Sequence, residues 1–241
     1  MNRTELIAFP DTETLVQQVA GRWLDAVEAA AVAGRPFHVA LPGGRVAGRF
    51  MAAAQALGVS RGTRWGHVQF HWGDERCVPP DHAESNYRLA QTALLDPAGI
   101  PTDQRNRLRG ELPPEEAARL AEAELARVTG TPASGVPVLD LVFLGMGEDG
   151  HVASLFPGAP ESVTNSDGWV LPVIGPKPPP QRLSMTFRVL AAAKEIWVLA
   201  SGAGKEGALA ESLRPGGTTP LARLISLRAR TTVMTDLQRP A

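Results

Sequence analysis

Short runs of apolar residues recur along the chain, and stretches with helical spacing separate them. The runs cover residues 37–41, 68–72, 139–144, 196–200 and 231–234. Most are continuous rather than alternating, as expected for strands that are covered on both faces. Helical patterns lie between them, at residues 46–56, 84–95, 114–128 and 205–213. This alternation predicts an α/β fold of the Rossmann-like type, an open, mostly parallel sheet with helices on both faces.

A further helix is expected before the first of these runs. Pro10, Asp11 and Thr12 form a typical helix start, and apolar residues then recur at helical spacing from Leu15 to Val27. The helix should end near Gly34. The length of 241 residues and an apolar fraction of 44% fit one large domain, residues 1–241, with a sizeable core.

Charge and cysteine content exclude several classes of function. A formal net charge of −1 leaves no broad basic surface for nucleic acid or anionic lipid, so local cations must hold any anionic ligand. The single cysteine, Cys77, excludes a disulfide framework and a cysteine-rich zinc site. The sequence shows neither a signal-peptide pattern nor an apolar stretch long enough to cross a bilayer, so a cytoplasmic location is expected.

Four of the predicted strands lead directly into loops rich in glycine and charged residues. These loops cover residues 42–45, 73–76, 145–151 and 201–205. In open parallel sheets ligands bind at the carboxyl ends of the strands. We therefore expect the four loops to form one binding site at that edge of the sheet.

Two of the loops have features of phosphate sites. Gly43 and Gly44 stand between a predicted strand and a predicted helix, where backbone N–H groups can reach a phosphate. A plain tight turn that binds no ligand would have the same sequence pattern. Lys205 follows Gly204 at a helix start and resembles part of a P-loop. Glu206 stands where that motif needs serine or threonine, so phosphate binding without a nucleotide is the better interpretation.

The loop at 145–151 formally contains the dinucleotide pattern G-x-G-x-x-G. We reject that interpretation because Pro157 and Pro160 leave little room for the long helix that must follow. The pair Asp149 and His151 carries more chemistry. An imidazole, with an ordinary pKa near ~6.5, can act as a base at neutral pH, and a nearby carboxylate can select its tautomer.

The remaining polar clusters allow two interpretations each. Arg76 could hold an anion while Asp74 orients a hydroxyl or the nucleophile, or both could belong to a surface ion-pair cluster. Lys177, three prolines and Arg182 form either a stiff extended arm with two cations or a surface loop. His67 and His71 would share a strand face, but no third ligand is evident, so no metal site is expected.

Taken together, these motifs resemble the 6-phosphogluconolactonase family. Residues 72–80 with Glu84-Ser85-Asn86-Tyr87 form one long motif, and residues 144–158, which include Gly147, form a second. Residues 176–182 and 202–205 match two shorter ones, so that the resemblance spans most of the chain in the right order. It implies hydrolysis of 6-phosphoglucono-δ-lactone in the pentose phosphate pathway, without metal or coenzyme.

The resemblance also implies roles for single residues. His151 would be the base that activates water, with support from Asp149. Substrate and phosphate would contact the positions Gly43, Gly44, Gly147, Arg76, Arg182 and Lys205. The family's glycine loop usually continues with Ser-Thr-Pro, whereas this chain has Arg45-Val46-Ala47. Arg45 could replace the lost hydroxyl contacts with a cation, or it could be a solvated residue at a helix start.

Two other functions fit parts of the same pattern. Glucosamine-6-phosphate deaminases and related aldose–ketose isomerases resemble this family, but they place a further acidic residue shortly after the histidine. Here Ser154-Leu155-Phe156 contains no acid, which favours the lactonase. A non-catalytic sugar-phosphate sensor usually carries a DNA-binding module, for which one domain of this length leaves no room. The sequence leaves open whether the chain is a monomer or a homodimer.

Overall fold

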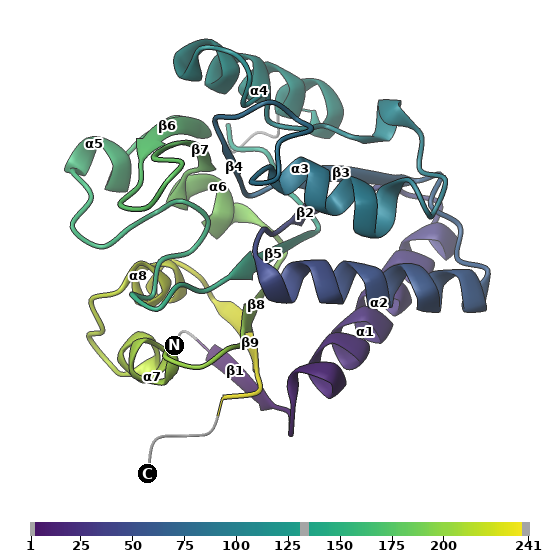
Figure 1. The fold of residues 1–241 in the computed structure, drawn as a ribbon, viewed down its shortest axis with the longest axis horizontal. Coiled ribbons are helices and arrows are strands. Elements are labelled where there is room, and N and C mark those ends of the chain that lie inside the picture. The colour runs from purple at the N-terminus through teal and green to yellow at the C-terminus, as the bar shows by residue number, and fades with distance from the viewer. Residues whose placement is uncertain (1–2, 131–134, 238–241) are drawn as a thin grey trace.

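A six-stranded parallel sheet forms the centre of the computed structural model, which describes residues 3–130 and 135–237 (Figure 1). The strand order is β1-β9-β8-β5-β2-β3, and each pair of neighbours is parallel. The strands are β1 (Arg3–Ala8), β2 (Phe37–Leu41), β3 (Val68–Trp72), β5 (Leu141–Gly145), β8 (Glu195–Ala200) and β9 (Arg230–Thr235). The predicted α/β fold and all five predicted strands are confirmed. Strand β1, which the apolar pattern did not reveal, pairs with β9 at the sheet edge.

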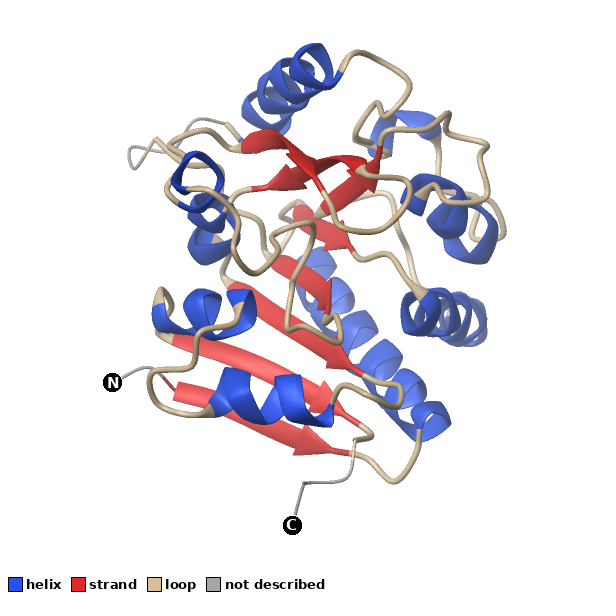
Figure 2. Cartoon of the chain, turned by 60° about the vertical axis from the view of Figure 1, so that its left-hand side comes forward, coloured by secondary structure: helices blue, strands red, loops and turns tan. Residues whose placement is uncertain are grey.

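Helices cover both faces of this sheet, as predicted. Helices α1 (Thr12–Val32) and α2 (Arg45–Arg61) lie on one face, and α7 (Glu206–Leu213) and α8 (Pro220–Ser226) lie on the other (Figures 1 and 2). Helix α1 begins where expected because the Asp11 carboxylate accepts a hydrogen bond of 2.7 Å from the backbone N–H of Thr14. In the described part of the chain, no helix has the length and apolar character needed to cross a membrane.

The remaining helical segments are shorter, with one exception. The segment predicted at 84–95 divides into α3 (Asn86–Ala90), capped by Ser85, and a π-helical turn η1 (Gln91–Leu95). Helix α4 (Pro114–Thr129) packs against strands of a second sheet. The others are η2 (Thr102–Gln104), α5 (Glu161–Thr164) and α6 (Phe187–Ala192).

The second sheet, with the order β4-β7-β6, was not predicted. It consists of β4 (Asp74–Arg76), β7 (Gln181–Met185) and β6 (Val170–Ile174), all antiparallel. The loop expected at 73–76 is therefore largely strand, and Arg182 lies on a strand rather than on an extended arm. Gly73 joins the two sheets, because its N–H donates to Leu41 and its carbonyl accepts from Met185.

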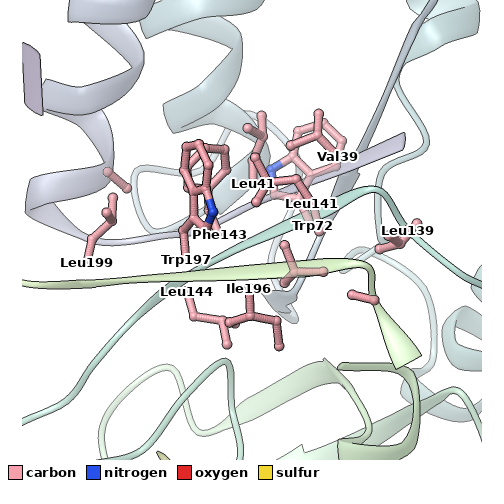
Figure 3. Packing of buried hydrophobic residues seen from close by; sticks show 14 of the residues in the cluster. Val39, Leu41, Trp72, Leu139, Leu141, Phe143, Leu144, Ile196, Trp197 and Leu199 are labelled. Atoms are coloured by element: carbon pink, nitrogen blue, oxygen red, sulfur yellow. The ribbon is translucent and has the colours of Figure 1, made fainter. Parts of the chain in front are cut away.

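The core lies between the large sheet and its helices. Alternation along β5 and β8 sends Phe143 and Trp197 to one side and Leu144 and Ile196 to the other (Figure 3). Trp23 of α1 lies 5.5 Å from Phe143, ring centroid to ring centroid. Because both faces of the strands are buried, their carboxyl ends are held in a rigid frame, and the loops that follow start from fixed positions.

Candidate active site

A cavity of about 750 Å³ opens at the carboxyl edge of the large sheet. Residues from all four predicted loops line it, because β8, β5, β2 and β3 are consecutive neighbours that end at the same edge. The cavity wall contains each of the sequence-predicted site residues except Asp149, which contacts the wall residue His151. The expected residues on the wall are Gly43, Gly44, Arg45, Asp74, Arg76, Gly147, His151, Lys177, Arg182 and Lys205.

His151 and Asp149 form a hydrogen-bonded pair at this cavity. The imidazole Nδ1 lies 2.6 Å from Oδ1 of Asp149, and the backbone N–H of His151 donates to the same oxygen at 3.1 Å. Burial opposes ionisation of Asp149, but the hydrogen bonds and the nearby imidazole outweigh it, so its pKa lies below the ordinary value. An ionised carboxylate can only accept. Nδ1 therefore carries the proton, and Nε2 is left as the basic nitrogen.

Gly147 makes room for this pair. A Cβ atom at this position would lie 2.0 Å from Nδ1 of His151 and 2.6 Å from Oδ1 of Asp149. The Gly147 N–H donates to the carbonyl of His151 at 2.9 Å, which closes the loop around the pair. The motif contained this glycine, but only the folded loop shows why: the His151 ring occupies the space that a side chain at position 147 would need.

Asp74 is buried on the cavity wall and is held from two directions. Ser154 Oγ donates to its Oδ2 at 2.7 Å, and Asn86 Nδ2 donates to its backbone carbonyl at 2.9 Å. Ser154 is itself fully buried. The sequence motifs did not assign it a role, although it is a polar residue within an apolar stretch. That pattern is the signal that could have indicated Ser154.

Glu75, between two cavity residues on β4, points to the opposite side of the strand. Its carboxylate accepts from the backbone N–H groups of Arg76, Asn86 and Tyr87 and from the Ser85 hydroxyl, at 2.7–3.0 Å. Burial outweighs these bonds and raises its pKa. Asn86 in turn packs against Gly43, where a Cβ would approach its Oδ1 to 2.1 Å. Glu75 thus fixes the cavity wall from behind and does not line the cavity.

Positive charge gathers on the cavity wall in two places. Burial lowers the pKa of Lys205, and the nearby Arg45 lowers it further. Burial likewise lowers the pKa of Arg182, with a further contribution from Arg76. Lys177 differs from these residues, because its side chain is 78% exposed and its Nζ lies 3.8 Å from Glu148. A cation whose pKa is lowered by burial and by a neighbouring cation carries positive charge that an anionic ligand would offset.

Backbone donors add to this charge at the start of α2. Gly44 is its N-cap, with φ of 93° and no side-chain cap. The N–H groups of the first helical turn have no partner within a helix and attract anions. Arg45 and Val46, the first residues of this turn, line the cavity.

His38, His67 and His71 do not line the cavity, and their arrangement differs from the one predicted. His71 Nε2 lies 3.3 Å from His38 Nδ1, whereas His67 precedes β3 and contacts the carbonyl of Val27 at 2.9 Å. The expectation that His67 and His71 share a strand face is wrong, because the strand begins after His67. Within residues 3–130 and 135–237, no cluster of three or more metal-ligating side chains is found.

Comparisons with known proteins agree with this arrangement. The 6-phosphogluconolactonase of Mycobacterium tuberculosis is 34% identical over 88% of this chain and 86% of its own length. The solved structure of 6-phosphogluconolactonase from Trypanosoma brucei has a TM-score of 0.83 at 26% identity, over 98% of this chain and 97% of the other. A monomeric glucosamine-6-phosphate deaminase shares the fold, with a TM-score of 0.81 at 17% identity over 96% of each chain. The family described as glucosamine-6-phosphate isomerases/6-phosphogluconolactonase matches residues 10–234, and this chain belongs to that family.

Proposed function

We propose that this chain hydrolyses 6-phospho-D-glucono-1,5-lactone to 6-phospho-D-gluconate, the lactonase step of the oxidative pentose phosphate pathway. The observation that carries the proposal is the His151–Asp149 pair at the edge of a cavity lined by cations. The likeness to 6-phosphogluconolactonases over most of the chain supports the same reaction.

The chemistry requires little from the protein beyond a base and charge stabilisation. A δ-lactone already carries an electrophilic carbonyl, so no covalent intermediate with the enzyme is needed. Nε2 of His151 takes a proton from water as the water oxygen attacks C1. The tetrahedral intermediate then collapses, the C1–O5 bond breaks, and the imidazolium returns the proton to O5. The carboxylic acid formed at C1 ionises and releases one proton.

In this proposal the phosphate group of the substrate binds at Lys205, Arg45 and the first turn of α2. Two cations and several unpartnered N–H groups suit a dianion with several acceptor oxygens. In this position Arg45 supplies charge where the family usually has a serine hydroxyl. Asp74, fixed by Ser154 and Asn86, is free to accept a hydrogen bond from a sugar hydroxyl through the cavity.

A coupled assay with freshly prepared lactone, corrected for spontaneous ring opening, tests the proposal. The wild-type chain should hydrolyse the lactone, and His151→Gln should lower kcat by ~10²–10⁴-fold with little change in KM. His82→Gln is the matched control, because His82 is exposed and lies outside the cavity wall. Release of ammonia from glucosamine 6-phosphate without lactone hydrolysis would identify a deaminase instead.

A further inference from the structure

Two arginines face each other across the strands of the second sheet. Arg76 of β4 and Arg182 of β7 are direct partners in the antiparallel register, and both line the cavity. Like charges in directly opposed positions destabilise a sheet. Arg182 is only 7% exposed, and its guanidinium donates to the backbone carbonyls of Pro179 and Lys177, each at 3.2 Å. Arg76 forms an ion pair with Glu84, whose Oε2 lies 3.1 Å from its Nη1. Among the described residues no carboxylate lies within ion-pair distance of Arg182, so its buried charge is offset only by these carbonyl groups.

This pair belongs to the wall that carries the catalytic histidine. The Phe156 ring lies 4.7 Å from the His151 ring, centroid to centroid, and the Cζ of Arg182 lies 5.7 Å from the Phe156 centroid. Asp74 acts electrostatically on Arg182 from the same wall. One aromatic side chain therefore connects the general base with the arginine pair.

The other cationic cluster has different neighbours. The charged groups that act on Lys205 are Arg45, Glu148 and Asp236, whereas those that act on Arg182 are Arg76, Asp74 and Glu84. The two sets also lie on different elements, because Arg76 and Arg182 belong to β4 and β7 of the second sheet, whereas Arg45 begins α2 and Lys205 is the N-cap of α7 beside the large sheet. The positive charge of the cavity is therefore divided between two separate clusters.

We infer that the two clusters serve opposite ends of the substrate, with Arg76 and Arg182 stabilising the negative charge that develops on the lactone carbonyl oxygen. The inference rests on the proposed function and departs from the resemblance, which places both arginines at the phosphate. The phosphate is an anion from the start, whereas the C1 end is neutral in the substrate and anionic after the reaction. Lys205, Arg45 and α2 fit the phosphate, and the arginine pair, which is linked to His151 through the Phe156 ring, fits the C1 end.

The like charges of the pair then favour catalysis over mere binding. As water attacks C1, the carbonyl electrons move onto its oxygen, and this oxyanion relieves the repulsion between the two guanidinium groups. A neutral carbonyl relieves it less, so the interaction is stronger in the transition state than in the ground state. After the C1–O5 bond breaks and O5 is protonated, the same pair faces the product carboxylate.

Kinetics of two matched variants test this division. With the phosphorylated lactone, Arg182→Met should lower kcat about 100-fold with a smaller change in KM, since it removes an oxyanion donor. Lys205→Met should raise KM about tenfold and change kcat less, since it removes a contact present throughout the reaction. If Arg182→Met does not fold, Arg76→Met replaces it with the same expectation.

Inhibition by product fragments gives a second measurement. Gluconate carries the carboxylate of the product without its phosphate group, and inorganic phosphate represents the phosphate group alone. Arg182→Met should weaken inhibition by gluconate and leave inhibition by phosphate unchanged, and Lys205→Met should do the reverse. If Arg182→Met instead raises KM and weakens phosphate inhibition as Lys205→Met does, the division is wrong while the lactonase assignment stands. A folded wild-type chain that does not hydrolyse the lactone overturns the proposed function itself.

Discussion

Replacing Gly147 by alanine should disable the His151–Asp149 pair through a single methyl group. The added Cβ would lie 2.0 Å from Nδ1 and 2.2 Å from Cε1 of His151, whereas ordinary contact begins at 3.4 Å. The imidazole must therefore withdraw by about 1.4 Å, or the loop must open. Gly147 is not in the positive-φ region, so the effect is a collision with the side chain and not a backbone penalty.

The size of the effect follows from that displacement. General-base assistance contributes ~10²–10⁴-fold, and a misplacement of about 1 Å can cost ~10²-fold. We therefore expect kcat of Gly147→Ala to fall at least about 100-fold. The proposed phosphate contacts at Lys205 and α2 are untouched by this change, so KM should change by less than about threefold.

Steady-state hydrolysis of the phosphorylated lactone, with thermal unfolding in parallel, measures this effect. Gly207→Ala is the matched control, because Gly207 is exposed within α7 and a Cβ there meets nothing within 4 Å. The control should keep its activity and gain slightly in stability, since alanine favours helix over glycine. A folded Gly147→Ala protein with kcat close to the wild type would refute the general-base geometry.

Two further predictions concern the Asp149 carboxylate and the buried imidazole of His71. Asp149→Asn should lower kcat by at least ~10²-fold at unchanged KM, because an amide no longer selects the Nδ1–H tautomer; kcat within twofold of wild type in steady-state kinetics would contradict this role. Burial, followed by the charge of His38, lowers the pKa of His71 to about 3. The unfolded imidazole titrates near ~6.5, so between about pH 6.5 and 3 the unfolded chain binds more protons than the folded chain. The free energy of unfolding therefore decreases as the pH is lowered through this range, by up to ~1.4 kcal/mol per pH unit. Urea unfolding from pH 7 to 5 should show this slope, flattened in His71→Asn and unchanged in the exposed control His82→Asn; equal slopes in all three would refute it.

The apolar runs were sufficient to predict five of the six strands of the large sheet and the location of the site. A strand buried on both faces must be continuously apolar, and parallel strands necessarily end at the same edge. The loops after β2, β3, β5 and β8 could therefore be brought together before any coordinates were known. His151 and Asp149 were identifiable because they are two residues apart, and their interaction depends mainly on local geometry.

The second sheet and the residues that it positions could not be predicted from the apolar pattern. Strands β4 and β7 carry Asp74, Arg76 and Arg182, whose polar side chains resemble loop residues, while their pairing uses backbone groups that every residue possesses. Ser154 and Asp74 are 80 positions apart, and their hydrogen bond exists only because β4 and the loop after β5 are packed together. Hydrophobic periodicity reports how each segment meets the core, so it determined the five strands other than β1 and the binding edge. Contacts between polar groups distant in the chain depend on the relative placement of whole elements, and only the tertiary structure decided them.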